Sequence, residues 1–155
     1  MFTKILCATD GSANADRALH LAGALAADAG TAVDVVHVIE YFPAGRVAGL
    51  TTRADEPEIR KRIEEQVQAS GVQCVTHMPH AAAGKAAQRI ADLAEELGSQ
   101  VIVIGTRGHS AVAGAMLGSV TQRLLHEAAC PVLAVPPVRE AAPATHTAET
   151  AAVAE

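Results

Sequence analysis

Short apolar runs alternate with amphipathic stretches along most of this chain. Residues 4–9 form one such run, and the apolar positions that follow recur on one helical face until Gly30. The run at 101–104 has no polar break, which is typical of a central parallel strand covered on both faces. The pattern predicts five strands, at 4–9, 31–39, 72–81, 101–104 and 131–135, and four helices, the first between a cap at Ser12 and a stop at Gly30 and the others near 56–70, 86–97 and 119–129.

Strands that alternate with helices indicate an α/β fold, an open five-stranded parallel sheet with helices on both faces and a Rossmann-like arrangement. Pro79 places the third strand at an edge of the sheet, because proline cannot donate a hydrogen bond to a neighbour. The helix at 56–70 is polar and is expected to face solvent mostly. Residues 41–54 read as a mobile loop, residues 1–137 as one domain, and residues 138–155 as a disordered tail.

Composition narrows the possible partners. The 155 residues are enough for one domain with a real core, but aromatic residues make up only 2% and the net charge is −5, so we expect no nucleic-acid partner. No apolar run approaches a membrane span, and the N-terminus lacks the layout of a signal peptide. Three scattered cysteines indicate reduced thiols, and we expect a cytoplasmic protein with no membrane association.

The segment GTRGHSAVAGAMLGS at 105–119 carries the strongest chemical signal, since it joins the end of an apolar strand to the start of a helix. Gly105 and Gly108 lack a Cβ, so they can take positive φ and let a ligand approach bare backbone. Gly118 and Ser119 can present free N–H groups at a helix N-terminus, where phosphate oxygens bind well. The segment therefore predicts a phosphate cradle that needs no net positive charge.

This segment and the following VTQRLLHEAACPVLAVP resemble the universal stress protein family, in its ATP-binding branch. That branch is marked by Gly, two residues, Gly, nine residues, Gly and Ser or Thr, and this chain meets every position. The opening KILCATDGS is also similar, so that the resemblance covers about residues 1–137. It implies ATP as ligand, with Mg²⁺ held through the phosphates, and a homodimer formed through the uncharged edge strand at Val132–Val135.

Within the resemblance, Asp10 would accept hydrogen bonds from ribose or adenine, although it can equally cap the first helix together with Ser12. The backbone at Val38 would hold the adenine edge; the alternative is a buried strand valine. Arg107 is either a phosphate ligand or a solvated loop cation, and His109 a loop or dimer-facing residue. The first strand often ends Pro-x-Asp in this family, and here Ala stands in place of Pro. The expected binding residues are Ala8, Thr9, Asp10, Val38, Gly105, Arg107, Gly108, Gly118, Ser119 and Val120.

Other motifs in the sequence are weaker evidence for a binding or catalytic site. Gly84-Lys85 resembles the end of a P-loop, but Ala86 replaces the hydroxyl residue and Pro79 stands where the first glycine belongs. Cys74, His77 and His80 are spaced three apart, which on a strand sends successive side chains to opposite faces and disfavours zinc. We expect these histidines to be surface strand residues, and no catalytic set is identifiable.

The ligand of an open α/β sheet binds at the carboxyl ends of the strands, where the winding reverses. In this family the first and fourth strands flank that point, and Asp10 and Gly105 follow them. The resulting hypothesis is an ATP-binding, homodimeric regulator in stress response. Two alternatives stay open: a slow ATPase or autophosphorylating enzyme with Ser119 or Thr121 as acceptor, and a dimeric interaction module in which the nucleotide is structural.

Overall fold

The computed structural model describes residues 1–41, 55–108 and 117–138. Apart from Tyr41 and Val138, the expected loop at 41–54 and the expected tail at 138–155 therefore fall outside the described residues. In chain order the elements are β1 Ile5–Ala8, α1 Ala13–Ala29, β2 Val33–Val36, β3 Ile39–Tyr41, α2 Glu56–Ser70, β4 Cys74–His77, β5 His80–Ala82, α3 Ala86–Leu97, β6 Val101–Gly105, α4 Ser119–Glu127 and β7 Val132–Val135.

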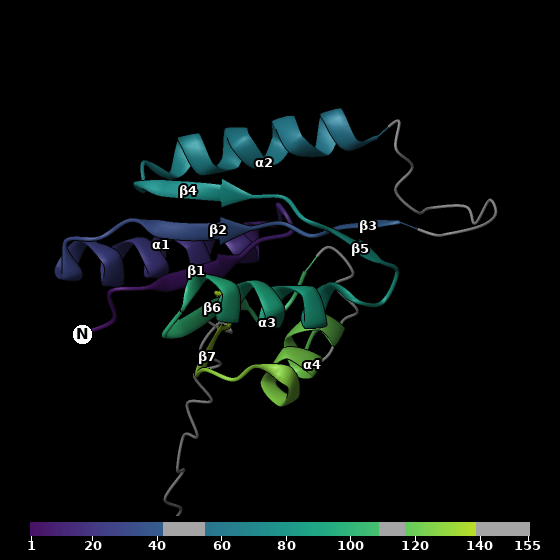
Figure 1. Ribbon diagram of the computed structural model, residues 1–155. Helices are drawn as coiled ribbons and strands as arrows, with labels where there is room; N and C mark the ends of the chain where they lie inside the picture. Colours follow the sequence, from purple (N-terminus) through teal and green to yellow (C-terminus); the bar gives the residue numbers. More distant parts are fainter. Residues whose placement is uncertain (42–54, 109–116, 139–155) are drawn as a thin grey trace, which may run out of the picture.

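The main sheet confirms the predicted architecture. Five strands pair in parallel in the order β4-β2-β1-β6-β7. β4 lies at one edge with α2 beyond it, and β7 lies at the other edge near α4 (Figure 1). β1 is central and pairs with β2 on one side and β6 on the other, so the winding reverses beside it. The carboxyl ends of β1 and β6 thus meet at the point where open α/β sheets bind ligands.

Two predicted strands are each broken in two. The expected strand at 31–39 divides into β2 and β3, and the one at 72–81 divides into β4 and β5; β3 and β5 pair in parallel as a separate two-stranded sheet. The backbone N–H of His37 donates to the His77 carbonyl at 3.0 Å, and that of Ile39 donates to the Pro79 carbonyl at 2.9 Å. Since Pro79 has no N–H of its own, the ladder cannot continue regularly past it, and both strands change course together.

The helix boundaries follow the local signals closely. The Ser12 hydroxyl accepts a hydrogen bond from the Ala15 N–H at 3.3 Å and caps α1, and Gly30 ends it with φ of 64°. α2 and α3 have the predicted bounds. α4 ends two residues before the predicted 129, at Glu127, because Ala128 already has an extended backbone with ψ of 135°.

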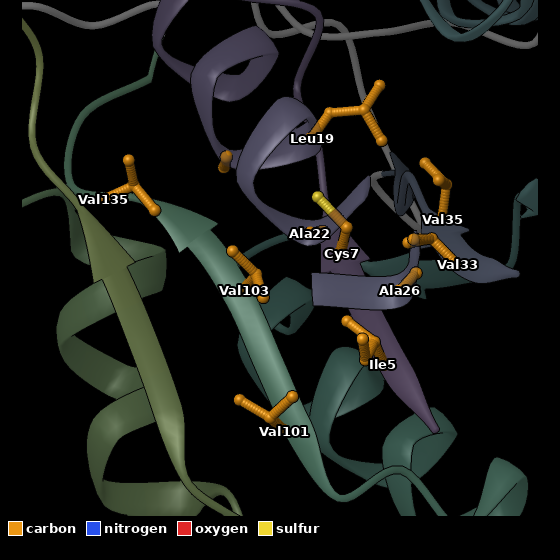
Figure 2. Close-up of a cluster of buried hydrophobic side chains, with 11 residues drawn as sticks. Ile5, Cys7, Leu19, Ala22, Ala26, Val33, Val35, Val101, Val103 and Val135 are labelled. Atoms are coloured by element: carbon orange, nitrogen blue, oxygen red, sulfur yellow. The ribbon is translucent and has the colours of Figure 1, made fainter. Parts of the chain in front are cut away.

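Alternate residues of the central strands face opposite layers. Figure 2 shows one layer, in which Ile5 and Cys7 of β1 pack against Leu19 and Ala22 of α1. Leu6 and Ala8 point to the other layer, which α3 and α4 cover. Helices therefore lie on both faces, as predicted, and small alanines let α1 approach the sheet closely.

The three cysteines are free thiols. Burial, with a smaller effect of the nearby Cys74, raises the pKa of Cys7 to about 12. Burial also raises the pKa of Cys74 and of Cys130. Because the thiolate is the reactive form, Cys7 behaves as a small core residue.

Candidate functional site

A cavity of about 560 Å³ opens at the carboxyl ends of β1 and β6. Asp10 lies two residues beyond the end of β1, and Gly105 is the last residue of β6. All ten residues that the sequence indicated line this one cavity: Ala8, Thr9, Asp10, Val38, Gly105, Arg107, Gly108, Gly118, Ser119 and Val120. His109, the remaining candidate, lies outside the described residues.

The glycines of the segment matter because they lack a side chain, and not because their backbone angles are unusual. Gly105 and Gly108 could take positive φ, but neither does. A Cβ on Gly105 would lie 2.8 Å from Nδ2 of Asn14, and one on Gly108 would overlap Oδ2 of Asp10. The missing side chains let the segment after β6 lie directly against the start of α1 and the turn after β1.

A hydrogen bond from Asn14 also holds the segment after β6 against the start of α1. Its Nδ2 donates to the carbonyl oxygen of Arg107 at 2.9 Å, although the two residues are far apart in sequence. The sequence did not single out Asn14, because a polar residue in the first turn of a helix has no distinctive pattern. Its contact became apparent only once α1 and the end of β6 were placed side by side.

Asp10 has a structural contact and a position beside the glycine segment. Its Oδ1 accepts a hydrogen bond from the Ser12 N–H at 3.0 Å, which supports the start of α1. Its Oδ2 faces Gly108. Asp10 can therefore support the start of α1 and also contact a ligand, so the two alternatives are compatible.

The start of α4 forms part of the cavity wall. Gly118 is its N-cap and has no side chain to cap the helix, and no capping hydrogen bond from a side chain is found at this end within the described residues. The Gly118 N–H was expected to be free, but it donates to the Thr106 carbonyl at 2.7 Å. Ser119 and Val120, in the first turn, line the cavity, and the first N–H groups of a helix have no intrahelical acceptor. Thr121 is buried, and its hydroxyl donates to the Gly105 carbonyl at 2.9 Å.

Part of the cavity lining is apolar. Val38, Ile39, Ile90 and Ile104 line it, and Val38 is partly buried against the α3 layer. Such a surface suits a flat, weakly polar ring.

The side chains of two polar residues in this region, His37 and Glu40, were not predicted to have a role. Nδ1 of His37 lies 2.9 Å from the Thr9 carbonyl oxygen. Glu40 accepts a hydrogen bond from the Ala86 N–H at the start of α3, at 3.1 Å. Both residues follow β2, where the predicted strand breaks, so a regular strand pattern gave them no special place.

α2 also reaches the cavity, which the sequence did not predict. Ile59 and Arg62 line it, although Ile63 is the only buried residue of this polar helix. Gln66 anchors the helix to the residue after β1 and to α1: the Thr9 hydroxyl donates to its Oε1 at 2.7 Å, and its Nε2 donates to Asp16 of α1 at 2.5 Å. The spacing of Ile59 and Ile63 was the available sign that one side of α2 is covered.

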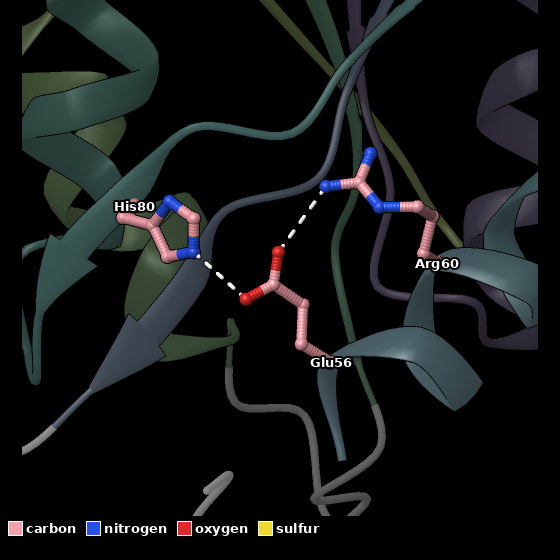
Figure 3. Close-up of polar contacts among 3 residues, drawn as sticks. All are labelled: Glu56, Arg60 and His80. Carbon is pink, nitrogen blue, oxygen red and sulfur yellow. Dashed lines mark hydrogen bonds and ion pairs between the residues drawn. The ribbon is translucent and has the colours of Figure 1, made fainter. Parts of the chain in front are cut away.

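A second polar contact joins the start of α2 to β5. Glu56 lies between His80, at 3.0 Å, and Arg60, at 3.2 Å (Figure 3). The hydrogen bonds from His80 and Arg60 hold the pKa of Glu56 below its ordinary value. His80 is thus a surface residue, as expected, but one with a defined partner. His77 is only 25% exposed, and its Nε2 lies 2.8 Å from Asp34.

The pKa of Glu56 gives a test of this contact. A lowered folded-state pKa stabilises the fold fully above the pKa of an unfolded glutamate, and that stabilisation is lost as the pH falls through the lower folded value. Glu56→Gln is therefore expected to lower the melting temperature slightly at neutral pH, by an amount that shrinks on acidification. Glu58→Gln, in the same helical turn, is the matched control. Equal shifts in both variants at every pH would contradict the contact.

The part of the chain described by the structure contains no group of three or more His, Cys, Asp or Glu that could hold a metal ion. Among its helices, none has the length and apolar character that crossing a bilayer requires.

A model of the universal stress protein family matches residues 1–136. The chain belongs to this family. A universal stress protein of Thermus aquaticus is 38% identical over 141 residues, with 87% of this chain and 99% of that protein covered. Universal stress protein A homolog 1 of Coxiella burnetii is 32% identical over 141 residues, with 86% and 96% covered.

Solved universal stress proteins share the fold. One from Archaeoglobus fulgidus in complex with dAMP is 27% identical with a TM-score of 0.65, and the match covers 86% of this chain and 97% of that one. A universal stress protein in complex with cAMP is 25% identical with a TM-score of 0.63, with 88% and 98% covered. Some solved universal stress proteins thus bind adenine nucleotides.

Proposed function

We propose that this universal stress protein binds ATP in the cavity beside β1 and β6 and acts as a nucleotide-dependent regulator in the response to stress. The observation that carries the proposal is the shape of the site. One cavity joins the start of α4, where the N-cap is Gly118, to the apolar surface around Val38, and Asp10, in the turn after β1, also lines it. Relatives in complex with dAMP and cAMP support an adenine nucleotide as the class of ligand.

In this proposal each region of the cavity binds one part of the nucleotide. The first-turn amides of α4 at Ser119 and Val120 bind phosphate oxygens, together with the Ser119 hydroxyl and Arg107. Gly105, Gly108 and Gly118 keep the cavity wall free of side chains. Asp10 accepts from the ribose or adenine, and the backbone near Val38 binds the adenine edge. Mg²⁺ is bound by the phosphates of the nucleotide.

The polar groups of the cavity favour holding ATP over hydrolysing it. Two carboxylates line the cavity, and each already supports backbone: Asp10 accepts from Ser12, and Glu40 accepts from Ala86. The Thr121 hydroxyl is buried and donates to Gly105, so it is a poor phosphate acceptor.

Isothermal titration of the purified protein with ATP, AMP and NAD tests the proposal. We expect ATP to bind more tightly than AMP, because additional phosphates meet the amides of α4, and NAD to bind weakly. No heat of ATP binding at millimolar concentration would overturn the proposal.

We further propose that the protein is a homodimer through β7. This strand is an edge of the main sheet and exposes Leu133, which is 39% accessible. An uncharged edge strand is suited to pairing with a second copy.

Leu133→Lys is expected to shift the protein from dimer to monomer in sedimentation, because two lysines would meet across the interface. Val75→Lys, on the opposite edge strand and 53% exposed, is the matched control and should leave the dimer intact. A dimer that survives Leu133→Lys would count against this interface.

Two smaller expectations belong to the same proposal. The three free cysteines support a cytoplasmic location. The family match to residues 1–136 supports a single domain over about 1–137.

A further inference from the structure

We propose that Arg62, from α2, is a phosphate-binding cation of the nucleotide site. The inference rests on the proposed function and adds a residue outside the glycine segment. Arg62 lines the cavity although it belongs to a polar, mostly exposed helix. Its Nε lies 3.1 Å from the position that a Cβ on Gly11 would occupy, so its guanidinium covers the turn after β1.

The basic residues of α2 have different surroundings. Arg60 pairs with Glu56 at 3.2 Å, and Lys61 pairs with Glu65 at 3.8 Å. Among the ion pairs and hydrogen bonds formed between described residues, Arg62 takes part in none. An exposed guanidinium at the rim of a cavity, with five N–H donors, is well suited to bind an anionic ligand.

The charge of the cavity lining supports the same role. Its formally charged residues are Asp10 and Glu40, which are acidic, and Arg62 and Arg107, which are basic. Without Arg62 the described lining would carry a net negative charge, which opposes the binding of a polyphosphate. Arg62 therefore restores neutrality beside the amides at the start of α4.

A series of contacts places Arg62 toward the glycine segment. Arg62 lies against Gly11, the residue after Asp10, and Asp10 in turn faces Gly108. These contacts place the guanidinium beside the turn after β1, the same turn whose Asp10 faces Gly108. In the proposed binding mode the phosphates are the anionic part of the ligand, so they are the expected partner of Arg62.

The position of Arg62 is held independently of its own side chain. Gln66, one turn later in α2, bonds to Thr9 and Asp16, and Glu56, at the start of the helix, bonds to His80. Replacing the exposed Arg62 is therefore expected to leave the fold and the placement of α2 intact.

The test compares Arg62→Gln with Lys61→Gln, which removes the same charge from the neighbouring position of the same helix. ATP binding is measured by isothermal titration at two salt concentrations, and adenosine binding by NMR chemical-shift titration. We expect Arg62→Gln to weaken ATP binding about tenfold or more, since a charge-assisted hydrogen bond is lost. The salt dependence should also fall, whereas adenosine binding should not change. Lys61→Gln should resemble wild type, and Arg62→Lys should recover part of the ATP affinity.

Three results would overturn the inference. Equal loss of ATP and adenosine binding in Arg62→Gln would assign the effect to the packing of α2. Wild-type ATP affinity in Arg62→Gln would remove Arg62 from the site while leaving the proposed function intact. Absence of ATP binding in the wild-type protein would overturn the proposed function itself, and the inference with it.

Discussion

Gly108→Ala is expected to weaken ATP binding by about a hundredfold. The added Cβ would overlap Oδ2 of Asp10, so that either the carboxylate or the segment after β6 must move. In the proposed binding mode Asp10 contacts the nucleoside and the segment forms the wall of the cavity. Either movement therefore disturbs the site, and isothermal titration with ATP measures the loss.

A double-mutant cycle with Asp10→Ala identifies the cause. If the overlap with the carboxylate is responsible, Gly108→Ala should have little further effect once Asp10 has been shortened. The melting temperature of Gly108→Ala should stay near that of wild type, because Gly108 lies at the cavity and not in the core. Wild-type ATP affinity in the single variant would contradict the predicted overlap.

Leu19→Ala is expected to reduce the free energy of unfolding by about 2.7–5.0 kcal/mol. Leu19 is fully buried in the layer between α1 and the sheet, where it packs with Cys7 and Val35 (Figure 2). Truncation removes apolar burial and leaves a cavity that a close-packed core fills only in part. A typical domain has about 5–15 kcal/mol of total stability, so the variant should unfold at a much lower urea concentration.

Leu21→Ala is the matched control, since Leu21 lies on the same helix but is 37% exposed. It makes the same chemical change with less loss of buried surface and no enclosed cavity. Its effect on the urea midpoint should be much smaller. Equal destabilisation by the two variants would show that the enclosed packing of Leu19 does not determine the effect, since alanine is at least as good a helix former as leucine.

Local patterns predicted residues that line the cavity because the fold brings strand ends together in a regular way. Once β1 and β6 are neighbours, the residues after each strand must lie at the same edge of the sheet, and Asp10 and Gly105 do. The physical role of the glycines was less predictable. Positive φ is a property of a single residue, but the space beside Gly108 depends on where Asp10 lies.

For α2, the sequence predicted the helix but not its contact with the cavity. Its bounds, Glu56–Ser70, follow from its composition and from the stop at Gly71. The polar pattern also correctly indicated a helix that is mostly exposed. It carried no information on which exposed residues reach the cavity, because Arg62 and Gly11 are brought together only by the packing of α2 on α1 and by the hydrogen bonds of Gln66.

The sequence by itself determined the order of strands and helices, their layers, and the residues that gather at the ends of β1 and β6. It could do so because apolar periodicity, helix caps and glycine spacing act over a few neighbouring residues. Only the tertiary structure decided the break of two strands beside Pro79, the close approach of Gly108 to Asp10, and the arrival of Arg62 at the cavity. Each of these depends on a contact between segments distant in the chain, which no local pattern encodes.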